Sequence, residues 1–155
     1  MDVHLQLALE LDRRMRVIQS PQTIEASRDG VVHKATIAWQ WTPDNRWSVS
    51  IESSAFDPFE ARADDAFEAL CTVREHLEPH GWRLGVIGAQ IDVWPSGMAR
   101  DQGGGLRAYR MSAEGPQDLV DTFEPADPTT VATVAAQRAE ADRLFEEMRR
   151  HAQGR

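Results

Sequence analysis

Apolar and polar side chains alternate along residues 23–54, a pattern typical of half-buried β-strands. The alternation is clearest in residues 31–41 and continues through residues 47–52. Between the first apolar run and the second, the dipeptide Asp29-Gly30 favours the two-residue turn of a β-hairpin. The pattern therefore predicts an antiparallel meander of three strands over residues 23–54.

In the middle of the chain the apolar spacing changes to three or four residues, as in an amphipathic α-helix. We expect one helix over about residues 60–78, ended by Pro79-His80-Gly81. A second apolar stripe predicts a C-terminal helix over about residues 128–150. Asp127 can cap its first turn, and Pro128 suits the first helical position.

The first segment, residues 3–19, fits two patterns. Its leucines alternate as in a strand, and several of them also fall on one helical stripe. Helix-favouring residues predominate in it, so we predict a helix and keep a strand as the alternative. Two further strands are expected, over about residues 82–94 and 106–111, connected through a long flexible loop over residues 98–105.

These elements, in the order α-β-β-β-α-β-β-α, predict a single α+β domain over residues 1–155. Its mainly antiparallel sheet of about five strands would be covered by the helices. The chain has 155 residues, of which 41% are hydrophobic, and this is enough for one core. No repeat or interdomain linker interrupts the chain, and residues 112–127 form a polar connection.

The sequence also bears on the compartment. No run of residues approaches the roughly 18 apolar positions of a membrane-spanning helix. Charged residues near the start argue against a secretory signal. The single cysteine, Cys71, cannot form an internal disulfide, which suits a reducing compartment. We therefore expect a cytoplasmic protein with no membrane partner.

The charge of the chain is unbalanced, with 17 basic against 25 acidic residues and a formal net charge of −8. Trp39, Trp41 and Trp47 could form a stacking platform for nucleic-acid bases. Nucleic-acid binders, however, need basic grooves to offset phosphate charge, and this acidic chain has a single lysine, Lys34. We expect no nucleic-acid partner, and we assign these tryptophans to the apolar face of the sheet.

No set of residues combines the nucleophile, base and orienting group that an enzyme site needs. Cys71 lies on an apolar helical stripe, where core packing explains it. His76 and His80 have a spacing that metal ligands use, but Pro79 ends the helix between them. Ser96 lies in a turn sequence and not in a nucleophile elbow. We predict no catalytic residues, no metal and no cofactor.

Acidic side chains crowd the expected helix over residues 60–78 and the turn before it. One interpretation is a solvated face that keeps the protein soluble. The other is a surface that attracts a basic protein, because neighbouring negative charges add and speed association. The candidate partner-binding residues are Asp57, Glu60, Asp64, Asp65 and Glu68.

Three consecutive glycines stand among three arginines later in the chain. They lead into a strand and match no phosphate-loop motif, which argues against a nucleotide cradle. A flexible hairpin loop is one interpretation. An anion or carboxylate site is the alternative, because arginine makes forked contacts to such groups. The candidate anion-binding residues are Arg100, Gly103, Gly104, Gly105, Arg107 and Arg110.

The segment from Asp92 to Tyr109, which contains Trp94-Pro95-Ser96-Gly97 and the three glycines, resembles part of a group of small bacterial proteins. Those proteins are uncharacterised and are encoded beside polymorphic toxins, where the neighbour is commonly an immunity protein. The resemblance implies a toxin-neutralising partner role and supplies no catalytic residues.

Two functional hypotheses follow. The first is a non-enzymatic, acidic protein-binding module, an immunity or inhibitor protein that neutralises a basic bacterial toxin. The second is a small enzyme or ligand sensor that binds an anionic metabolite at the glycine-rich segment Arg100–Arg110. The sequence does not decide the oligomeric state.

Overall fold

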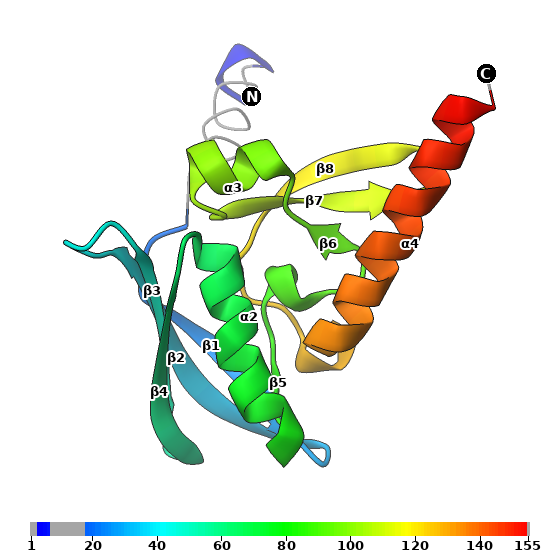
Figure 1. Ribbon diagram of the computed structural model, residues 1–155. Coiled ribbons are helices and arrows are strands. Elements are labelled where there is room, and N and C mark those ends of the chain that lie inside the picture. The colour runs from blue at the N-terminus through cyan, green and yellow to red at the C-terminus, as the bar shows by residue number, and fades with distance from the viewer. Residues whose placement is uncertain (1–2, 7–17, 155) are drawn as a thin grey trace.

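The computed structural model describes residues 3–6 and 18–154 of the chain, which form a single α+β domain (Figure 1). The strands are β1 (Gln22–Arg28), β2 (Val31–Trp41), β3 (Trp47–Ser53), β4 (Phe56–Ala63), β5 (Arg83–Leu84), β6 (Val93–Trp94), β7 (Arg107–Ser112) and β8 (Gly115–Asp121). The helices are α2 (Ala66–Leu77), α3 (Gly97–Gly103) and α4 (Val134–Gln153), with short 3-10 turns η1 (Glu78–His80), η2 (Ile87–Ala89) and η3 (Pro128–Thr130).

Five antiparallel strands form the first sheet, in the order β4-β3-β2-β1-β5. Strands β1 to β3 are the predicted meander, which the structure confirms. Asp29 and Gly30 both have positive φ angles, 53° and 77°, as a two-residue hairpin turn requires. Ile37 of β2 and Val49 of β3 are buried in the core, whereas Thr36, Ala38 and Ser50 beside them are more exposed.

Strand β4 corrects the predicted helix over residues 60–78, which begins only after this strand ends. Ala61 and Ala63 are buried and alternate with exposed Glu60 and Arg62, the period of a strand. Ala63 also fits the apolar spacing of the following helix, and this shared fit is why the spacing predicts a helix that starts too early. Because β4 is the edge strand, it tolerates Pro58 better than a central strand would.

The strand predicted over residues 82–94 is divided into β5, η2 and β6. Two glycines bring this part of the chain against neighbouring backbone. A Cβ atom on Gly85 would lie 2.2 Å from the carbonyl oxygen of Ala126, and Gly88 N–H donates to the carbonyl of Thr122 at 2.9 Å. The close backbone contacts explain why no continuous strand forms here.

Strands β6, β7 and β8 form a second, three-stranded antiparallel sheet that the sequence did not predict. Strand β7 matches the prediction over residues 106–111. Strand β8 lies within the supposed connection 112–127, and most of its side chains are exposed. A largely exposed, polar edge strand lacks the alternation by which strands are identified in sequence.

Two helical segments also differ from expectation. The supposed flexible loop over residues 98–105 contains α3, whose first turn is capped by the Ser96 hydroxyl at 3.0 Å from a backbone nitrogen. The predicted helix over residues 128–150 is divided as well. Asp127 caps the 3-10 turn η3, and Thr133 caps α4, which starts six residues later than expected and ends at Gln153.

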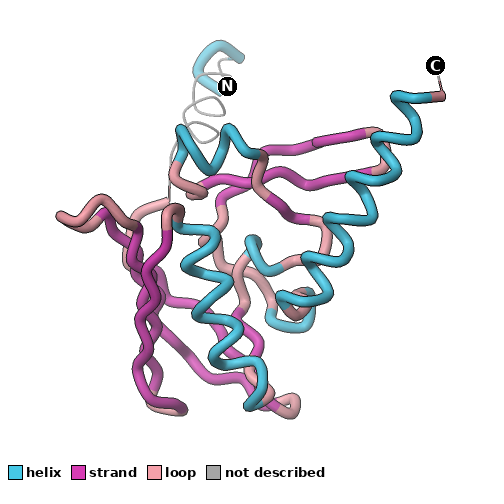
Figure 2. The backbone as a smooth tube through the Cα atoms, in the orientation of Figure 1, coloured by secondary structure: helices cyan, strands magenta, loops and turns pink. Residues whose placement is uncertain are grey.

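Helix α2 packs between the two sheets (Figure 2), and most of its residues are buried. Ala66 and Ala69 contribute to the core shared with the first sheet, where small side chains allow close approach. Phe67 and Cys71 face the second core cluster, which also contains Val93 of β6. The helix therefore joins both halves of the interior.

A buried polar network joins α2 to α4. The Arg74 guanidinium is 1% exposed and donates to Gln137 Oε1 at 2.6 Å and to the carbonyl of Ala132 at 2.8 Å. Its Nε lies 3.5 Å from Glu78. The Gln137 amide nitrogen in turn donates to the carbonyls of Gly88, Gln90 and Val93.

The predicted N-terminal helix over residues 3–19 lies mostly on residues 7–17, outside the described residues. Residues 3–6 are helical and residues 18–21 are not. Within the described part of the chain, no helix has the length and apolar character needed to cross a membrane.

Candidate functional site

The five candidate acidic residues lie on different elements, which corrects the expectation that they share one helical face. Asp57 and Glu60 belong to β4, and Asp64 follows that strand. Asp65 caps α2, and Glu68 lies in its first turn. Three of the five therefore line the edge of the first sheet, and two belong to the helix.

The three acids at the sheet edge face solvent. The Asp64 side chain is 99% exposed and lies 3.9 Å from Arg46, at the limit of an ion pair. Glu60 lies 3.3 Å from Arg62, and both side chains are about half exposed. Asp57 is exposed, and it forms no ion pair with any residue that the structure describes. We call Asp57, Glu60 and Asp64 the acidic edge.

The two helical acids turn instead toward arginines. One oxygen of Asp65 accepts the Glu68 backbone N–H at 2.8 Å, and the other lies 3.1 Å from Arg100 Nη1. Glu68 lies between two guanidinium groups, 3.3 Å from Arg100 and 2.7 Å from Arg138. These charges neutralise one another, and charge-assisted hydrogen bonds of this kind fix the positions of both partners.

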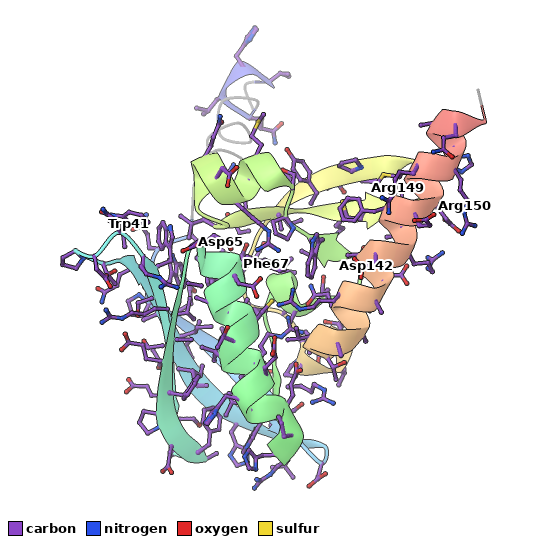
Figure 3. The ribbon with its side chains drawn as sticks, viewed as in Figure 1. Trp41, Asp65, Phe67, Asp142, Arg149 and Arg150 are labelled. Carbon is purple, nitrogen blue, oxygen red and sulfur yellow. The ribbon has the colours of Figure 1, made fainter. Side chains whose placement is uncertain are left out.

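Aromatic rings complete this contact. The Arg100 guanidinium lies 5.4 Å from the ring centroids of both Phe67 and Trp94, and that of Arg138 lies 5.6 Å from Trp94. Figure 3 shows Asp65 and Phe67 at the same end of α2. We call this group the Arg100 cluster, which consists of Asp65, Glu68, Phe67, Trp94, Arg100 and Arg138.

Sequence reasoning did not select Arg138 or Trp94 as members of a site. The available signal was an arginine within the apolar stripe of the C-terminal helix, a position that only a paired cation occupies at low cost. The ion pairs of Arg138 with Glu68 and Glu75 explain that position.

The glycines hold α3 against α2. Gly104 and Gly105 have φ angles of 64° and 73°, which favour glycine. A Cβ atom on Gly104 would lie 2.7 Å from the Trp47 ring, and one on Gly105 would lie 2.8 Å from Asp65. Gly103 has open space around its Cα. Two of the three glycines are thus required by packing, whereas the third is not.

The other two candidate arginines face their own carboxylates. Arg107 Nε lies 3.5 Å from Asp121, and Arg110 lies 3.1 Å from Asp92 and donates to Gln90 at 2.8 Å. Burial raises the pKa of Asp121, an effect that the positive charge of Arg107 opposes. The three candidate arginines therefore have separate partners, and anion binding by all of them together stays a prediction.

Comparison of the chain with protein-family models and with curated proteins finds no match. Its function has to be inferred from the geometry and charge of its surfaces. The segment from Asp92 to Tyr109 forms β6, α3 and the start of β7, and it supplies Trp94 and Arg100 to the Arg100 cluster. Its resemblance to proteins encoded beside toxins stays a prediction.

The face of the first sheet that points away from α2 is open and polar. Thr36 and Glu52 line two shallow hollows of about 300 and 370 Å³, and the small side chains of Ala38 and Ser50 line the smaller one. No helix among the described residues covers this face (Figure 1). Because β4 borders it, the open face is continuous with the acidic edge.

Cys71 is a core residue, and the two central histidines lie in the last turn of α2 and in the turn after it. Burial raises the pKa of the Cys71 thiol to about 11, so it stays protonated as a core residue. The His76 ring stacks on Phe59 at 3.8 Å, and His80 lies in η1. Among the described residues, no group of three or more histidine, cysteine or acidic side chains could hold a metal ion.

Proposed function

We propose that this protein is a non-enzymatic module that binds a basic protein through the acidic edge and the adjoining open face of the first sheet. The observation that carries the proposal is the exposure of Asp57, Glu60 and Asp64 along an uncovered edge strand. Two exposed arginines nearby offset only part of this charge, since Arg46 is at the limit of ion-pair distance and Arg62 bridges two acids.

Only the outward-facing acids can attract a partner in this proposal. The charges of Asp65 and Glu68 are compensated inside the Arg100 cluster, so they add little to the field outside the protein. The remaining field has the sign that speeds association with a basic surface. Small side chains on the open face would let a flat partner approach closely.

We further propose that the partner is a basic bacterial toxin and that this chain acts as its immunity or inhibitor protein in the cytoplasm. The net charge of −8 supports this choice, because it provides long-range attraction to a basic protein. The resemblance of the Asp92–Tyr109 segment to proteins encoded beside toxins supports it independently of charge.

The test uses a basic protein encoded next to this chain in the source genome, purified and mixed with it in stopped-flow experiments. Changing Asp57 and Asp64 to lysine should slow association by about tenfold or more at low salt. Added salt should slow the unaltered protein in the same way, because it screens exposed charges. Co-expression should protect cells from the neighbouring protein, and the double variant should protect them less.

A matched control reverses the charge of two exposed acids on other elements, Asp101 of α3 and Asp118 of β8. Equal association rates for this control and the Asp57/Asp64 variant would remove the acidic edge from the interface. A neighbouring protein that neither binds nor harms cells would contradict the inhibitor role. Copurification of a phosphorylated metabolite would favour the alternative of a ligand sensor.

A further inference from the structure

An apolar groove lies between α3 and the second sheet, on a surface that the proposed protein-binding role does not use. It has a volume of about 410 Å³ and includes Met98, Leu106, Tyr109 and Leu119 in its lining. Met98 is 68% exposed and Leu119 is 47% exposed. Large apolar side chains gathered around one hollow commonly mark a binding surface.

The pairing of β7 with β8 explains how the groove is built. Tyr109 lies opposite Leu119, and Arg107 lies opposite Asp121. Because side chains two residues apart share one face of a strand, both pairs point to the same side of the sheet. The floor of the groove therefore joins an apolar pair to a charged pair.

Helix α3 forms the opposite wall, and its position is fixed before any ligand binds. Arg100 ties the helix to Asp65 and Glu68 of α2, and Gly104 accepts a backbone hydrogen bond from Ala66 at 2.6 Å. A preformed groove loses little conformational freedom on binding, which favours affinity for a small molecule.

The charged pair on the floor is incompletely bonded. Arg107 Nη2 has no hydrogen-bond acceptor and Asp121 Oδ1 has no donor among the described residues, although both atoms are buried. Their ion pair, 3.5 Å from Arg107 Nε to Asp121 Oδ1, is too long for a strong hydrogen bond. Native proteins rarely leave such atoms unpaired. Nη2 itself is covered, but Arg107 lines the groove and its side chain is 24% exposed, so the exposed part of the side chain can meet an acceptor there.

We propose that this groove binds a small apolar carboxylate, with its alkyl or aryl body against Met98, Tyr109 and Leu119 and its carboxylate at Arg107. The single guanidinium matches one carboxylate, and the apolar walls disfavour sugars and phosphorylated molecules. Of the six candidate anion-binding residues, only Gly103 and Arg107 line the groove. The inference does not depend on the proposed protein-binding function.

Octanoate is a suitable probe, with octanol and octylamine as neutral and cationic ligands of the same chain length. Titrations followed by NMR of the backbone amides should show octanoate shifting signals of α3, β7 and β8. Octanol should bind about tenfold more weakly, since it lacks the charge-assisted hydrogen bond, and octylamine should not bind. Equal affinity for octanoate and octanol would overturn the role of Arg107.

Variants of the charged pair give a sharper result. Arg107→Gln should weaken octanoate binding by about tenfold or more. Asp121→Asn should strengthen it, because it removes the carboxylate that competes for the guanidinium. A purely structural role for the pair predicts no gain from Asp121→Asn. Weaker or unchanged binding in that variant, at unchanged thermal stability, would overturn the proposal.

The apolar wall has its own matched pair of variants. Leu119→Glu should abolish octanoate binding, because it places a negative charge in the groove. Ile91→Glu alters an equally apolar residue that is 42% exposed and lies outside the groove, and it should bind like the unaltered protein. The proposal fails if both variants bind octanoate alike, or if the unaltered protein shows no shifts at millimolar octanoate.

Discussion

At the scale of single residues, arginine connects parts of this protein that are distant in sequence. Lys34 is the only lysine among 17 basic residues, and arginine's planar group can contact several acceptors at once. Arg74 joins α2 to the loop before α4 and to Gln137, and Arg138 joins α4 back to α2. The abundance of arginine therefore serves internal structure at these positions, and only part of it is available to ligands.

The network around Arg74 leads to the first prediction at this scale. Gln137→Leu removes the acceptor at 2.6 Å from Arg74 and the donor to three backbone carbonyls. We expect it to lower the free energy of unfolding by about 3–5 kcal/mol, because it leaves a buried charge incompletely bonded. Urea denaturation followed by tryptophan fluorescence measures the change.

Gln153→Leu provides the control, since it makes the same substitution at an exposed position of the same helix. Its effect should stay within about 0.5 kcal/mol. If both variants unfold at the urea concentration of the unaltered protein, the network does not stabilise the fold and Arg74 is satisfied in another way.

At the scale of elements, the short helix α3 is held by its C-terminal glycines more than by its own length. Seven residues form too few hydrogen bonds for a helix that is stable alone. Its position depends on Gly104 against Trp47 and Gly105 against Asp65. Both the Arg100 cluster and the apolar groove therefore depend on backbone geometry at two residues.

Gly105→Ala should be strongly destabilising, because its Cβ atom would lie 2.8 Å from both Asp65 Oδ1 and the Phe67 backbone nitrogen. We expect a loss of about 1–3 kcal/mol from strain at this backbone conformation. Gly103→Ala adds a methyl group in open space within α3 and should stabilise by up to about 1 kcal/mol. Thermal unfolding of the two variants should shift in opposite directions. Equal shifts would show that α3 is not anchored through Gly105.

The elements also differ in how far local sequence determines them. The turn Asp29-Gly30 and the alternation in residues 31–41 are local features, so the meander was predictable. Strand β8 was not, because its polar side chains pack on little and only its pairing with β7 makes it a strand. The candidate site likewise depends on long-range contacts that the local sequence does not show. Asp65 and Arg100 were each selected, but their contact spans 35 residues and depends on how α3 docks.

At the scale of the whole molecule, two sheets share one central helix and one outer helix. Helix α2 contributes to both core clusters, and α4 adds Val134 to the second cluster and Gln137 to the polar network between the sheets. The distal turns of α4 project past these contacts (Figure 3), where Arg149 and Arg150 are exposed. The turns of α4 up to Leu144, which contain its buried residues, should therefore carry its structural role.

Two truncations test this division of α4. A chain that ends at Thr133 loses Val134 and Gln137, which opens the second core cluster and leaves Arg74 without its amide acceptor. These losses should remove much of the free energy of unfolding, which is about 5–15 kcal/mol for a typical domain. We expect this chain to be insoluble, or to lack a cooperative unfolding transition by circular dichroism. A chain that ends at Arg149 loses no buried residue among those that the structure describes, and it should unfold cooperatively near the temperature of the full chain. Cooperative unfolding of the shorter chain would mean that the first sheet and α2 form a domain without α4.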